Sequence, residues 1–379
     1  MNKLSILQFI NVRWLNAEAG YGLTLSKKLH ERGHRVFVCG VENTPPVNTA
    51  RDMGLNTFTS LKLHHYNPFY LFKDLNILID FINEENIKVI NTHRSEGHFL
   101  GALAKKTFKN KLVLIRTRGD VRFPKNYFFN RWLYNYTDKI ITSSYMMEKT
   151  YFAKLHVPQE KIITIYNAVD IKRFNPRVDG TEIRNKYGIR ENEILVGIVG
   201  RLSPVKGHKY FIDAASIILK QRPDIKFIVS GKESQIKFVD LKAQAEQLNI
   251  EKQIIFSGVE KDVTQLMAAI DIGVVASLGS ETNCRVTQEF MAMERPLVGT
   301  NVGVIPEVLL NGECGKIVPP GDSQSIAGAI LDLINNTKYS ALLGKNARKR
   351  MVDNFNEDLF VEKTEEIYFK CISESIGEL

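Results

Sequence analysis

The chain has few of the residues that mark secreted, metal-binding or membrane-spanning proteins. It has four cysteines among 379 residues, and these show neither CxxC pairing nor metal-ligand spacing with histidine. No apolar run approaches the roughly 18 residues that a membrane-spanning helix needs, and the first residues lack a signal peptide's apolar region and cleavage site. We therefore expect free thiols and a cytoplasmic protein.

Sequence repeats, low-complexity tracts and long lysine or arginine runs are also absent. The net charge is nevertheless +9, which favours nucleic acid, an anionic membrane surface or a phosphorylated substrate as partner. Without a basic run or an RNA-binding signature, we expect no nucleic acid. The hydrophobic share of 44% and the charged share of 25% are typical of a globular protein.

Apolar, strand-like runs alternate with amphipathic helical stretches along the chain. This alternation predicts an α/β fold with doubly wound parallel sheets. Residues 177–192 are polar and charged, which is typical of an interdomain linker with an entry helix. We therefore expect one domain over residues 1–176 and a second over residues 177–356.

One stretch, residues 280–293, organises the second half. It follows a predicted buried strand, and apolar residues at helical spacing predict a helix from about Arg285. Glu281 falls in the loop and Glu289 in the first turns of that helix. The carboxylates can accept hydrogen bonds from sugar hydroxyls, and free backbone N–H groups there can hold a phosphate. The alternative is a solvated loop residue and a surface helix residue.

A second strand-to-helix loop runs from Gly200 to Gly207. Glycine lets the backbone come close to a ligand, Arg201 offers a planar fork for phosphate oxygens, and Lys206 offers a mobile point charge. Two cations on one such loop suit a diphosphate. A solvated loop is the plainer interpretation.

The first half has polar residues where predicted strands end. His93 and Arg94 close one strand, and Arg118 and Asp120 close another. Ligands of parallel α/β sheets bind at such carboxyl ends, so these residues are candidates for a site. For His93 the alternative is a hydrogen-bonded structural role.

Two further segments are open to two interpretations. Gly20 and Gly22 follow the first strand and give a phosphate or acceptor loop, or else a plain tight turn, because the third glycine of the dinucleotide pattern is missing. Residues 122–134 interleave basic and aromatic residues, as in an interfacial helix on anionic lipid or in an aromatic core face.

Three segments in this order resemble a known family: residues 200–207, 281–289 and 315–321. They are similar to the C-terminal half of retaining glycosyltransferases of family 4, and the resemblance is specific from about residue 165 onward. The family has the GT-B fold, in which two Rossmann-like domains face a cleft. The resemblance also implies that a helix over about 357–379 crosses back to complete the first domain.

The resemblance assigns roles to residues of this sequence. Arg201 and Lys206 would bind the donor diphosphate, Glu289 the ribose and Glu281 the transferred sugar. His93, Glu281, Arg201 and Lys206 would form the catalytic group, and Arg94, Arg118 and Asp120 would lie on the acceptor side. The expected donor contacts also include Gly20, Gly200, Gly258, Thr282, Asn283, Cys284, Arg285 and Val286. Residues 282–285 replace the family's usual glycine and aromatic filling, a departure that bears on the donor sugar.

The implied reaction moves a hexose from a nucleotide-diphosphate sugar to a hydroxyl of a glycan or glycolipid, with retained configuration. No DxD-type acidic cluster accompanies the phosphate loop, so we expect neither metal nor cofactor. The sequence is similar to enzymes of lipopolysaccharide or capsule assembly, which implies work at the inner face of the cell membrane. Two alternatives stay open: a nucleotide-sugar epimerase or phosphorylase of the same fold, and a non-catalytic nucleotide-sugar-binding protein.

Overall fold

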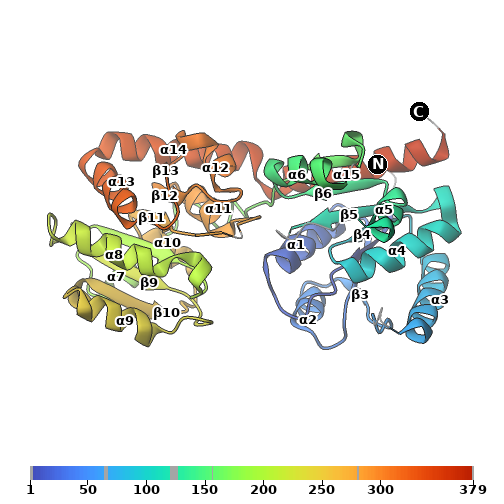
Figure 1. The fold of residues 1–379 in the computed structure, drawn as a ribbon, viewed down its shortest axis with the longest axis horizontal. Coiled ribbons are helices and arrows are strands. Elements are labelled where there is room, and N and C mark those ends of the chain that lie inside the picture. The colour runs from blue at the N-terminus through green and yellow to red at the C-terminus, as the bar shows by residue number, and fades with distance from the viewer. Residues whose placement is uncertain (1–2, 64–66, 120–126, 156, 280, 378–379) are drawn as a thin grey trace. The chain divides into compact units, whose positions relative to one another are not determined.

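The computed structural model describes residues 3–63, 67–119, 127–155, 157–279 and 281–377 (Figure 1). Asp120 and the first residues of the basic and aromatic segment, 122–126, lie outside the described residues. The chain divides into two compact units: unit 1 is residues 1–168 with 357–379, and unit 2 is residues 169–356.

Unit 1 is built on a parallel sheet with the strand order β3-β2-β1-β4-β5-β6-β7. Its strands are β1 (Ser5–Phe9), β2 (Arg35–Cys39), β3 (Asn56–Phe58), β4 (Val89–Thr92), β5 (Val113–Arg118), β6 (Lys139–Thr142) and β7 (Ile162–Thr164). Its helices are α1 (Ala17–Glu31), α2 (Pro45–Asp52), α3 (Pro68–Glu84), α4 (Ser95–Phe108), α5 (Phe128–Asn135), α6 (Tyr145–Leu155) and α15 (Glu357–Ile376).

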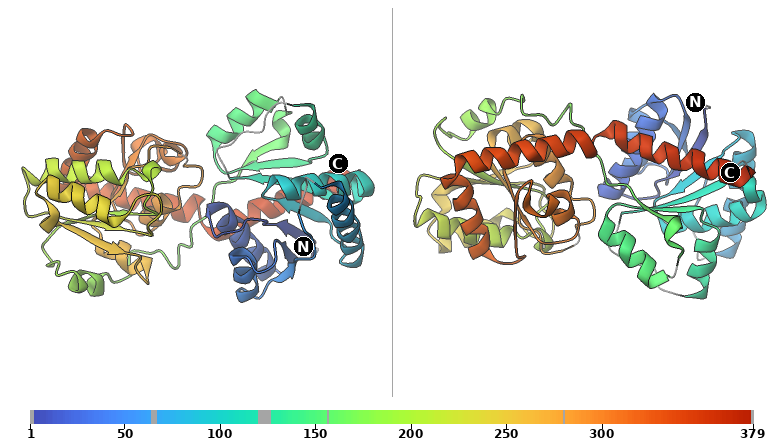
Figure 2. Two further views of the ribbon diagram at one scale, coloured as in Figure 1. Left: turned by 60° about the horizontal axis from the view of Figure 1, so that its bottom comes forward. Right: turned by 90° about the horizontal axis from the view of Figure 1, so that it is seen from above.

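Helices cover both faces of this sheet. On one face, α1 presents Tyr21, Leu25 and Leu29 at helical spacing, and these pack with Tyr368 of α15 against the strands. The other face is covered by apolar residues of α3, α4 and α5. Figure 2 shows α15 lying along unit 1, where it runs beside α1. The last helix of the chain therefore contributes to the core of unit 1.

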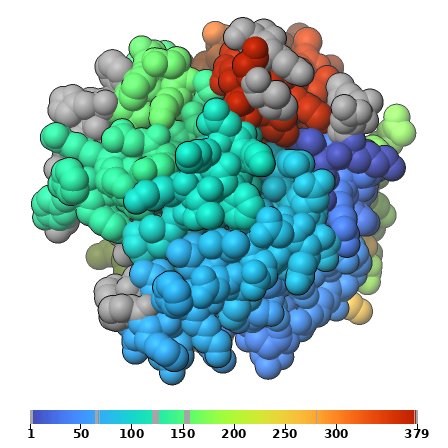
Figure 3. Space-filling view, turned by 90° about the vertical axis from the view of Figure 1, so that its right-hand side faces the viewer, coloured from blue at the N-terminus to red at the C-terminus, as the bar shows by residue number. Residues whose placement is uncertain are grey.

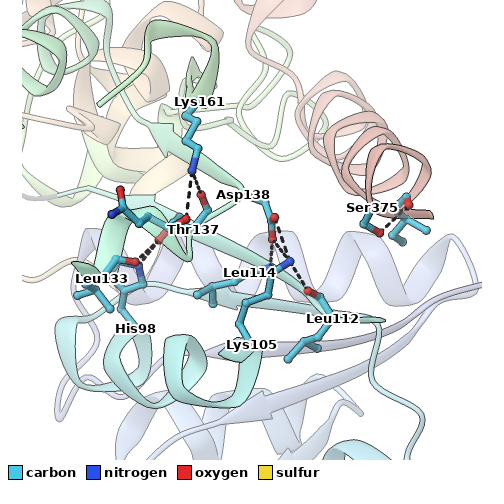
Figure 4. A network of polar contacts seen from close by, with 11 residues as sticks. His98, Lys105, Leu112, Leu114, Leu133, Thr137, Asp138, Lys161 and Ser375 are labelled. Carbon is cyan, nitrogen blue, oxygen red and sulfur yellow. Dashed lines mark hydrogen bonds and ion pairs between the residues drawn. The ribbon is translucent and has the colours of Figure 1, made fainter. Parts of the chain in front are cut away.

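A paired charge network joins α4 to the strand ends of unit 1 (Figure 4). The Asp138 carboxylate accepts from Nζ of Lys105 at 2.8 and 3.0 Å and from the Leu114 N–H at 2.7 Å. Nζ of Lys161 donates to the Thr137 carbonyl at 2.9 Å, and burial lowers the pKa of Lys161. Because each charge here has partners, we interpret the network as structural.

Unit 2 is a second parallel sheet, with the strand order β10-β9-β8-β11-β12-β13. Its strands are β8 (Leu195–Val199), β9 (Lys226–Ser230), β10 (Ile254–Gly258), β11 (Ile272–Val275), β12 (Leu297–Thr300) and β13 (Lys316–Val318). Its helices are α7 (Thr181–Lys186), α8 (His208–Leu219), α9 (Phe238–Gln247), α10 (Val263–Ala269), α11 (Arg285–Ala292), α12 (Ile305–Val308), α13 (Ser323–Asn335) and α14 (Thr337–Asn354).

The strand order of unit 2 reverses between β8 and β11. The two strands pair in parallel, with Val196 opposite Ile272 and Ile198 opposite Val274. Their carboxyl ends therefore deliver the loop before α8 and the loop before α11 to the same edge of the sheet. Such a reversal is the position where open α/β sheets bind ligands.

The predicted α/β architecture with parallel sheets is confirmed. Among the described residues, no helix is both long enough and apolar enough to cross a membrane.

Candidate functional site

An ion pair joins the two candidate loops of unit 2. Nζ of Lys206 donates to Oε1 of Glu281, and the Ser277 hydroxyl donates to the same oxygen at 2.5 Å. The Glu281 side chain is 4% exposed and that of Lys206 is 31% exposed. The buried carboxylate of Glu281 thus has the partners that a buried acid needs, Lys206 and Ser277.

Two glycines allow close backbone contacts here: Gly207 lets the Lys206 loop approach the end of β11, and Gly303 lets the loop after β12 approach Glu281. Gly207 has a φ of +71°, and a Cβ there would lie 1.9 Å from the Ala276 carbonyl oxygen. Gly303 has a φ of +56°, and a Cβ there would lie 1.9 Å from the Glu281 carbonyl oxygen. The Val304 N–H donates to that same carbonyl at 2.9 Å. Only glycine fits both positions, so the backbone around Glu281 is fixed.

Arg201 lies on the same loop as Lys206 but, unlike that lysine, has no ion-pair partner among the described residues. It is exposed, and no hydrogen bond or ion pair engages its guanidinium within the described ranges. The N–H of the neighbouring Gly200 donates to the Ser230 carbonyl at 2.9 Å, so this N–H is already used in a hydrogen bond to the end of β9. The Gly258 carbonyl likewise accepts from the Gly231 N–H at 2.8 Å. Arg201 therefore keeps its donors available for a ligand.

Helix α11 begins immediately after the Glu281 loop. Its N-cap, Cys284, has a left-handed backbone with a φ of 35°, and its Sγ lies 2.6 Å from Oγ1 of Thr287. Burial, with Glu281 nearby, raises the pKa of the Cys284 thiol, which stays protonated at neutral pH. The N–H groups of Arg285 and Val286 stand in the first turn, where a helix offers no acceptor of its own. This end of α11 can therefore donate to an anion.

Glu289 lies one turn further into α11. Its carboxylate is 3.3 Å from Nη2 of Arg285. Burial raises the pKa of Glu289, while Arg285 and Arg173 oppose that shift. Within the described residues, no hydrogen bond or ion pair links Glu289 or Arg201 to the Lys206–Glu281 pair.

Sequence reasoning missed two buried polar residues beside Lys206. The Ser203 hydroxyl is buried without a hydrogen bond, and neither ring nitrogen of His208 makes one of normal geometry among the described residues. Burial, followed by the charge of Lys206, lowers the pKa of His208 to about 4, so the ring is neutral at pH 7. Ser203 lies within the predicted phosphate loop and His208 directly follows it, and this position was the signal that could have found them.

Three further buried side chains lie in the Glu281 loop: those of Thr282, Asn283 and Cys284. Of the residues that replace the family's glycine and aromatic filling, 282–284 are therefore buried in unit 2, whereas Arg285 is exposed. The alternative for this stretch, a solvated Glu281 and a surface Glu289, does not fit the burial of both residues.

His93 is buried in the core of unit 1. Its Nε2 lies 3.0 Å from Oε1 of Gln8, and Gln8 in turn contacts the Tyr368 hydroxyl at 3.2 Å. Burial, followed by the charge of Arg116, lowers the pKa of His93 to about 3, so the ring is neutral. Nδ1 is buried without a hydrogen bond among the described residues. His93 thus has a hydrogen-bonded structural setting, and a contact with sugar or acceptor stays a prediction.

The placement of Gly20 in a phosphate or acceptor loop is wrong. Helix α1 begins at Ala17, capped by the Asn16 side chain, and the Gly20 N–H donates to the Asn16 carbonyl at 2.9 Å. The two glycines therefore lie inside a helix. At Gly22 a Cβ would lie 2.7 Å from Cδ1 of Ile10 and 3.2 Å from Nε2 of His93, so this glycine allows α1 to pack closely.

The expected acceptor-side residues have different settings. Nη1 of Arg94 lies 3.4 Å from Oε2 of Glu18, in the first turn of α1. Arg118, at the end of β5, is buried. Asp120 lies outside the described residues. Among the described residues, no three His, Cys, Asp or Glu side chains come together as metal ligands would.

Two protein-family models match the chain. The model for Glycosyltransferase Family 4 matches residues 21–173, and the model for glycosyl transferases group 1 matches residues 179–350. Together they fall on both units and include the Lys206 and Glu281 loops.

The chain is also similar to characterised proteins along most of its length. N-acetyl-alpha-D-glucosaminyl L-malate synthase of Bacillus anthracis is 25% identical over 363 residues, which is 93% of each protein. The Escherichia coli UDP-Gal:alpha-D-GlcNAc-diphosphoundecaprenol alpha-1,3-galactosyltransferase is 23% identical over 80% of this chain and 81% of its own. The crystal structure of a glycosyltransferase from Rickettsia africae ESF-5 matches with a TM-score of 0.89 at 22% identity, over 98% of this chain and 99% of that one. The fold is GT-B, and the chain belongs to the glycosyltransferases, with a Family 4 domain followed by a group 1 domain.

Proposed function

We propose that this glycosyltransferase moves a hexose from a nucleotide-diphosphate sugar to a hydroxyl acceptor and retains the anomeric configuration. The observation that carries the proposal is the contact between Lys206 and Glu281 beside the N-terminus of α11. A cation for phosphate, an acid for hydroxyls and free backbone donors thus lie within two adjoining loops.

Each group has a role in this proposal. Arg201 and Lys206 bind the diphosphate, and the backbone N–H groups of residues 282–286 hold the sugar and phosphate. Glu281 accepts from hydroxyls of the transferred sugar, and Glu289 accepts from the ribose. The exposed, uncommitted Arg201 supports this assignment, because a ligand phosphate can engage its guanidinium without breaking an existing contact.

The barrier is lowered where charge develops. As the bond between the sugar and the diphosphate breaks, the sugar gains oxocarbenium character and the leaving diphosphate gains negative charge. Arg201, Lys206 and the positive end of α11 stabilise that charge. Lys206 and Ser277 engage Oε1 of Glu281, and we propose that this carboxylate orients the sugar and does not attack the anomeric carbon. We propose that the reaction needs no metal ion.

The acceptor is proposed to be a cell-surface glycan or glycolipid, as in lipopolysaccharide or capsule assembly. The name of the Escherichia coli relative gives UDP-Gal as donor and a diphosphoundecaprenol lipid as acceptor. An acceptor of that kind is held in a membrane, so the enzyme must reach a membrane surface.

Exposed aromatic side chains on two helices of unit 1 support that location. On α3 these are Phe69 and Phe72, and around α5 they are Tyr127, Phe128 and Phe129, with Phe128 86% exposed. Helix α4 contacts both α3 and α5, and Figure 3 shows the face of unit 1 over these helices. The exposed Lys73, Lys106, Lys109 and Lys111 belong to the same helices or to the turn after α4. Aromatic and basic residues together suit the anionic inner face of a cell membrane.

The experiment that tests this proposal offers the purified protein UDP-galactose, UDP-glucose, UDP-N-acetylglucosamine and GDP-mannose, with and without lipid-linked acceptors. We expect one donor to release its nucleoside diphosphate only when acceptor is present, in EDTA as well as without it. Nuclear magnetic resonance of the product should show the donor's anomeric configuration.

The same assay separates the alternatives. An epimerase would change the sugar without any acceptor, and a phosphorylase would require inorganic phosphate. A non-catalytic binding protein would bind a nucleotide sugar without turnover in every acceptor extract. An inverted product would contradict the retaining mechanism.

A further inference from the structure

Asn283 carries a buried carboxamide that the protein leaves without partners. The residue is 3% exposed, yet neither Nδ2 nor Oδ1 makes a hydrogen bond in the part of the chain that the structure describes. Buried amides are almost always hydrogen-bonded, because losing water without gaining a partner is unfavourable. A polar side chain in this state indicates a ligand that supplies the missing contacts.

The backbone on both sides of Asn283 is fixed. The Val304 N–H holds the Glu281 carbonyl on one side, and α11 begins directly after Cys284 on the other. Asn283 therefore stands between the carboxylate that Lys206 engages and the helix end that offers free N–H groups. The facing loop carries the Ser203 hydroxyl, which is buried and makes no hydrogen bond among the described residues. Unpaired buried polar atoms thus lie on both loops of the candidate site.

The hydrogen-bonding groups of the Asn283 amide indicate which part of a nucleotide sugar it contacts. Nδ2 can only donate and Oδ1 can only accept, and both are unpaired. An ionised diphosphate offers acceptors alone, so it would leave Oδ1 unsatisfied. Sugar hydroxyls both donate and accept, so a hexose satisfies both ends of the amide.

We propose that Asn283 is a specificity-determining residue that hydrogen-bonds the hydroxyls of the transferred sugar. This inference rests on the proposed function, and it adds a side-chain contact to the backbone contacts of the same loop. Residues 282–285 differ from the family's usual glycine and aromatic filling. On this inference, the difference lets the site recognise its sugar through a polar side chain at position 283.

Calorimetric titration of two ligand pairs tests the inference: UDP with UDP-galactose, and GDP with GDP-mannose. For the pair that the wild type binds, we expect Asn283→Leu to raise the Kd of the nucleotide sugar roughly tenfold and that of the nucleoside diphosphate less than about twofold. Asn346→Leu is the matched control, because the Asn346 amide lies in α14 and donates to the Glu313 carbonyl at 3.1 Å. It should leave both affinities unchanged.

Thermal unfolding without ligand separates sugar recognition from a structural role. Because Asn283→Leu removes two unsatisfied polar atoms, we expect its Tm to equal or exceed that of the wild type. A lower Tm with equal losses for both ligands would show that the amide supports the fold, and unchanged affinities would show that water satisfies it. Either result overturns the inference and leaves the proposed function standing. If the wild type binds none of the four nucleotide sugars of the turnover assay and neither UDP nor GDP, the proposed function fails and the inference fails with it.

Discussion

His34 and Glu365 are 331 residues apart in the chain and share a hydrogen bond of 2.5 Å between Nε2 and Oε1. The Leu4 N–H donates to Nδ1 of the same ring at 3.1 Å, so Nε2 is the nitrogen that donates to Glu365. Arg32 donates to the other Glu365 oxygen at 2.9 Å. The carboxylate on α15 is therefore bound to residues near the start of the chain.

We expect Glu365→Gln to loosen α15 from unit 1 and to lower stability by about 1–3 kcal/mol. Burial alone would raise the pKa of Glu365, but hydrogen bonds from His34 and Arg32 outweigh it and hold the pKa below its ordinary 4.5. Because the pKa of Glu365 is lower in the native state than in the unfolded state, its charged carboxylate stabilises the fold above pH 4.5. This stabilisation is lost as the pH falls through the native pKa. The difference between wild type and variant should therefore shrink between pH 7 and acid.

Hydrogen exchange of the α15 amides measures this effect. Glu362→Gln is the control, because Glu362 is an exposed carboxylate on the same helix. Equal protection of α15 in wild type and Glu365→Gln would contradict the anchoring role.

Arg201→Ala and Lys206→Ala should both abolish most turnover, by at least about 100-fold, because each removes a cation from the leaving diphosphate. Their effects on stability should differ. Arg201 is exposed, so its loss should change the unfolding free energy by less than about 0.5 kcal/mol. Loss of Lys206 leaves Glu281 buried with an unpaired charge, which should destabilise unit 2 by about 3–5 kcal/mol.

Turnover and urea unfolding of the two variants check this contrast. Arg177→Ala, at an exposed position of unit 2, should match the wild type in both measurements. Normal turnover in either Arg201→Ala or Lys206→Ala would refute the role of the two cations.

Glu289→Gln should weaken donor binding while it stabilises the free protein at neutral pH. Because burial raises the pKa of Glu289, the charged form is disfavoured in the native state, and this penalty is present above the native pKa. Below the ordinary value of 4.5 the carboxyl is neutral in both states, so the Tm difference should disappear there.

A differential scanning series from pH 4 to pH 8, with titration of UDP and of 2′,3′-dideoxy-UDP, tests both parts. The loss of affinity should be confined to UDP, because the analogue has no ribose hydroxyls for Glu289 to accept from. Equal UDP affinity in wild type and variant would contradict the ribose contact.

Replacing Phe72 and Phe128 with serine should weaken binding to vesicles of anionic phospholipid several-fold. Both side chains are exposed, and each buried aromatic of this size contributes about 1.5–3 kcal/mol at most. Binding should also weaken as salt rises from 0.05 to about 0.5 M, since salt screens the lysines. Leu342→Ser, at an exposed leucine of unit 2, is the control. Salt-insensitive binding, or an equal loss in the control, would discard the membrane proposal.

Most of the architecture and the position of the two loops could be predicted from local sequence patterns. The helical spacing of Tyr21, Leu25 and Leu29 indicates the buried face of α1, and Gly207, at the end of the loop after β8, marks a close approach. Lys206 and Glu281 could be placed at strand ends because parallel strands share an edge. The same approach misplaced Gly20, because two nearby glycines suggest a loop while the Asn16 cap shows that a helix has already begun.

Contacts between distant parts of the chain could not be predicted from local sequence patterns. The His34–Glu365 bond and the polar contacts around His93 depend on which residues the sheet brings together, and no periodicity reports that. The unpaired amide of Asn283 is invisible for a similar reason. A sequence shows which atoms can form hydrogen bonds, whereas only the packed loop shows which of them lack a partner.

The discontinuity of unit 1 has a consequence for how the protein is made. The chain leaves unit 1 after residue 168 and returns to it at residue 357, so residues 169–356 are one unbroken piece. As the ribosome works from the N-terminus, all strands and helices of unit 2 emerge before α15 does. Unit 2 can therefore reach its native state during translation, whereas unit 1 stays incomplete until α15 has been made.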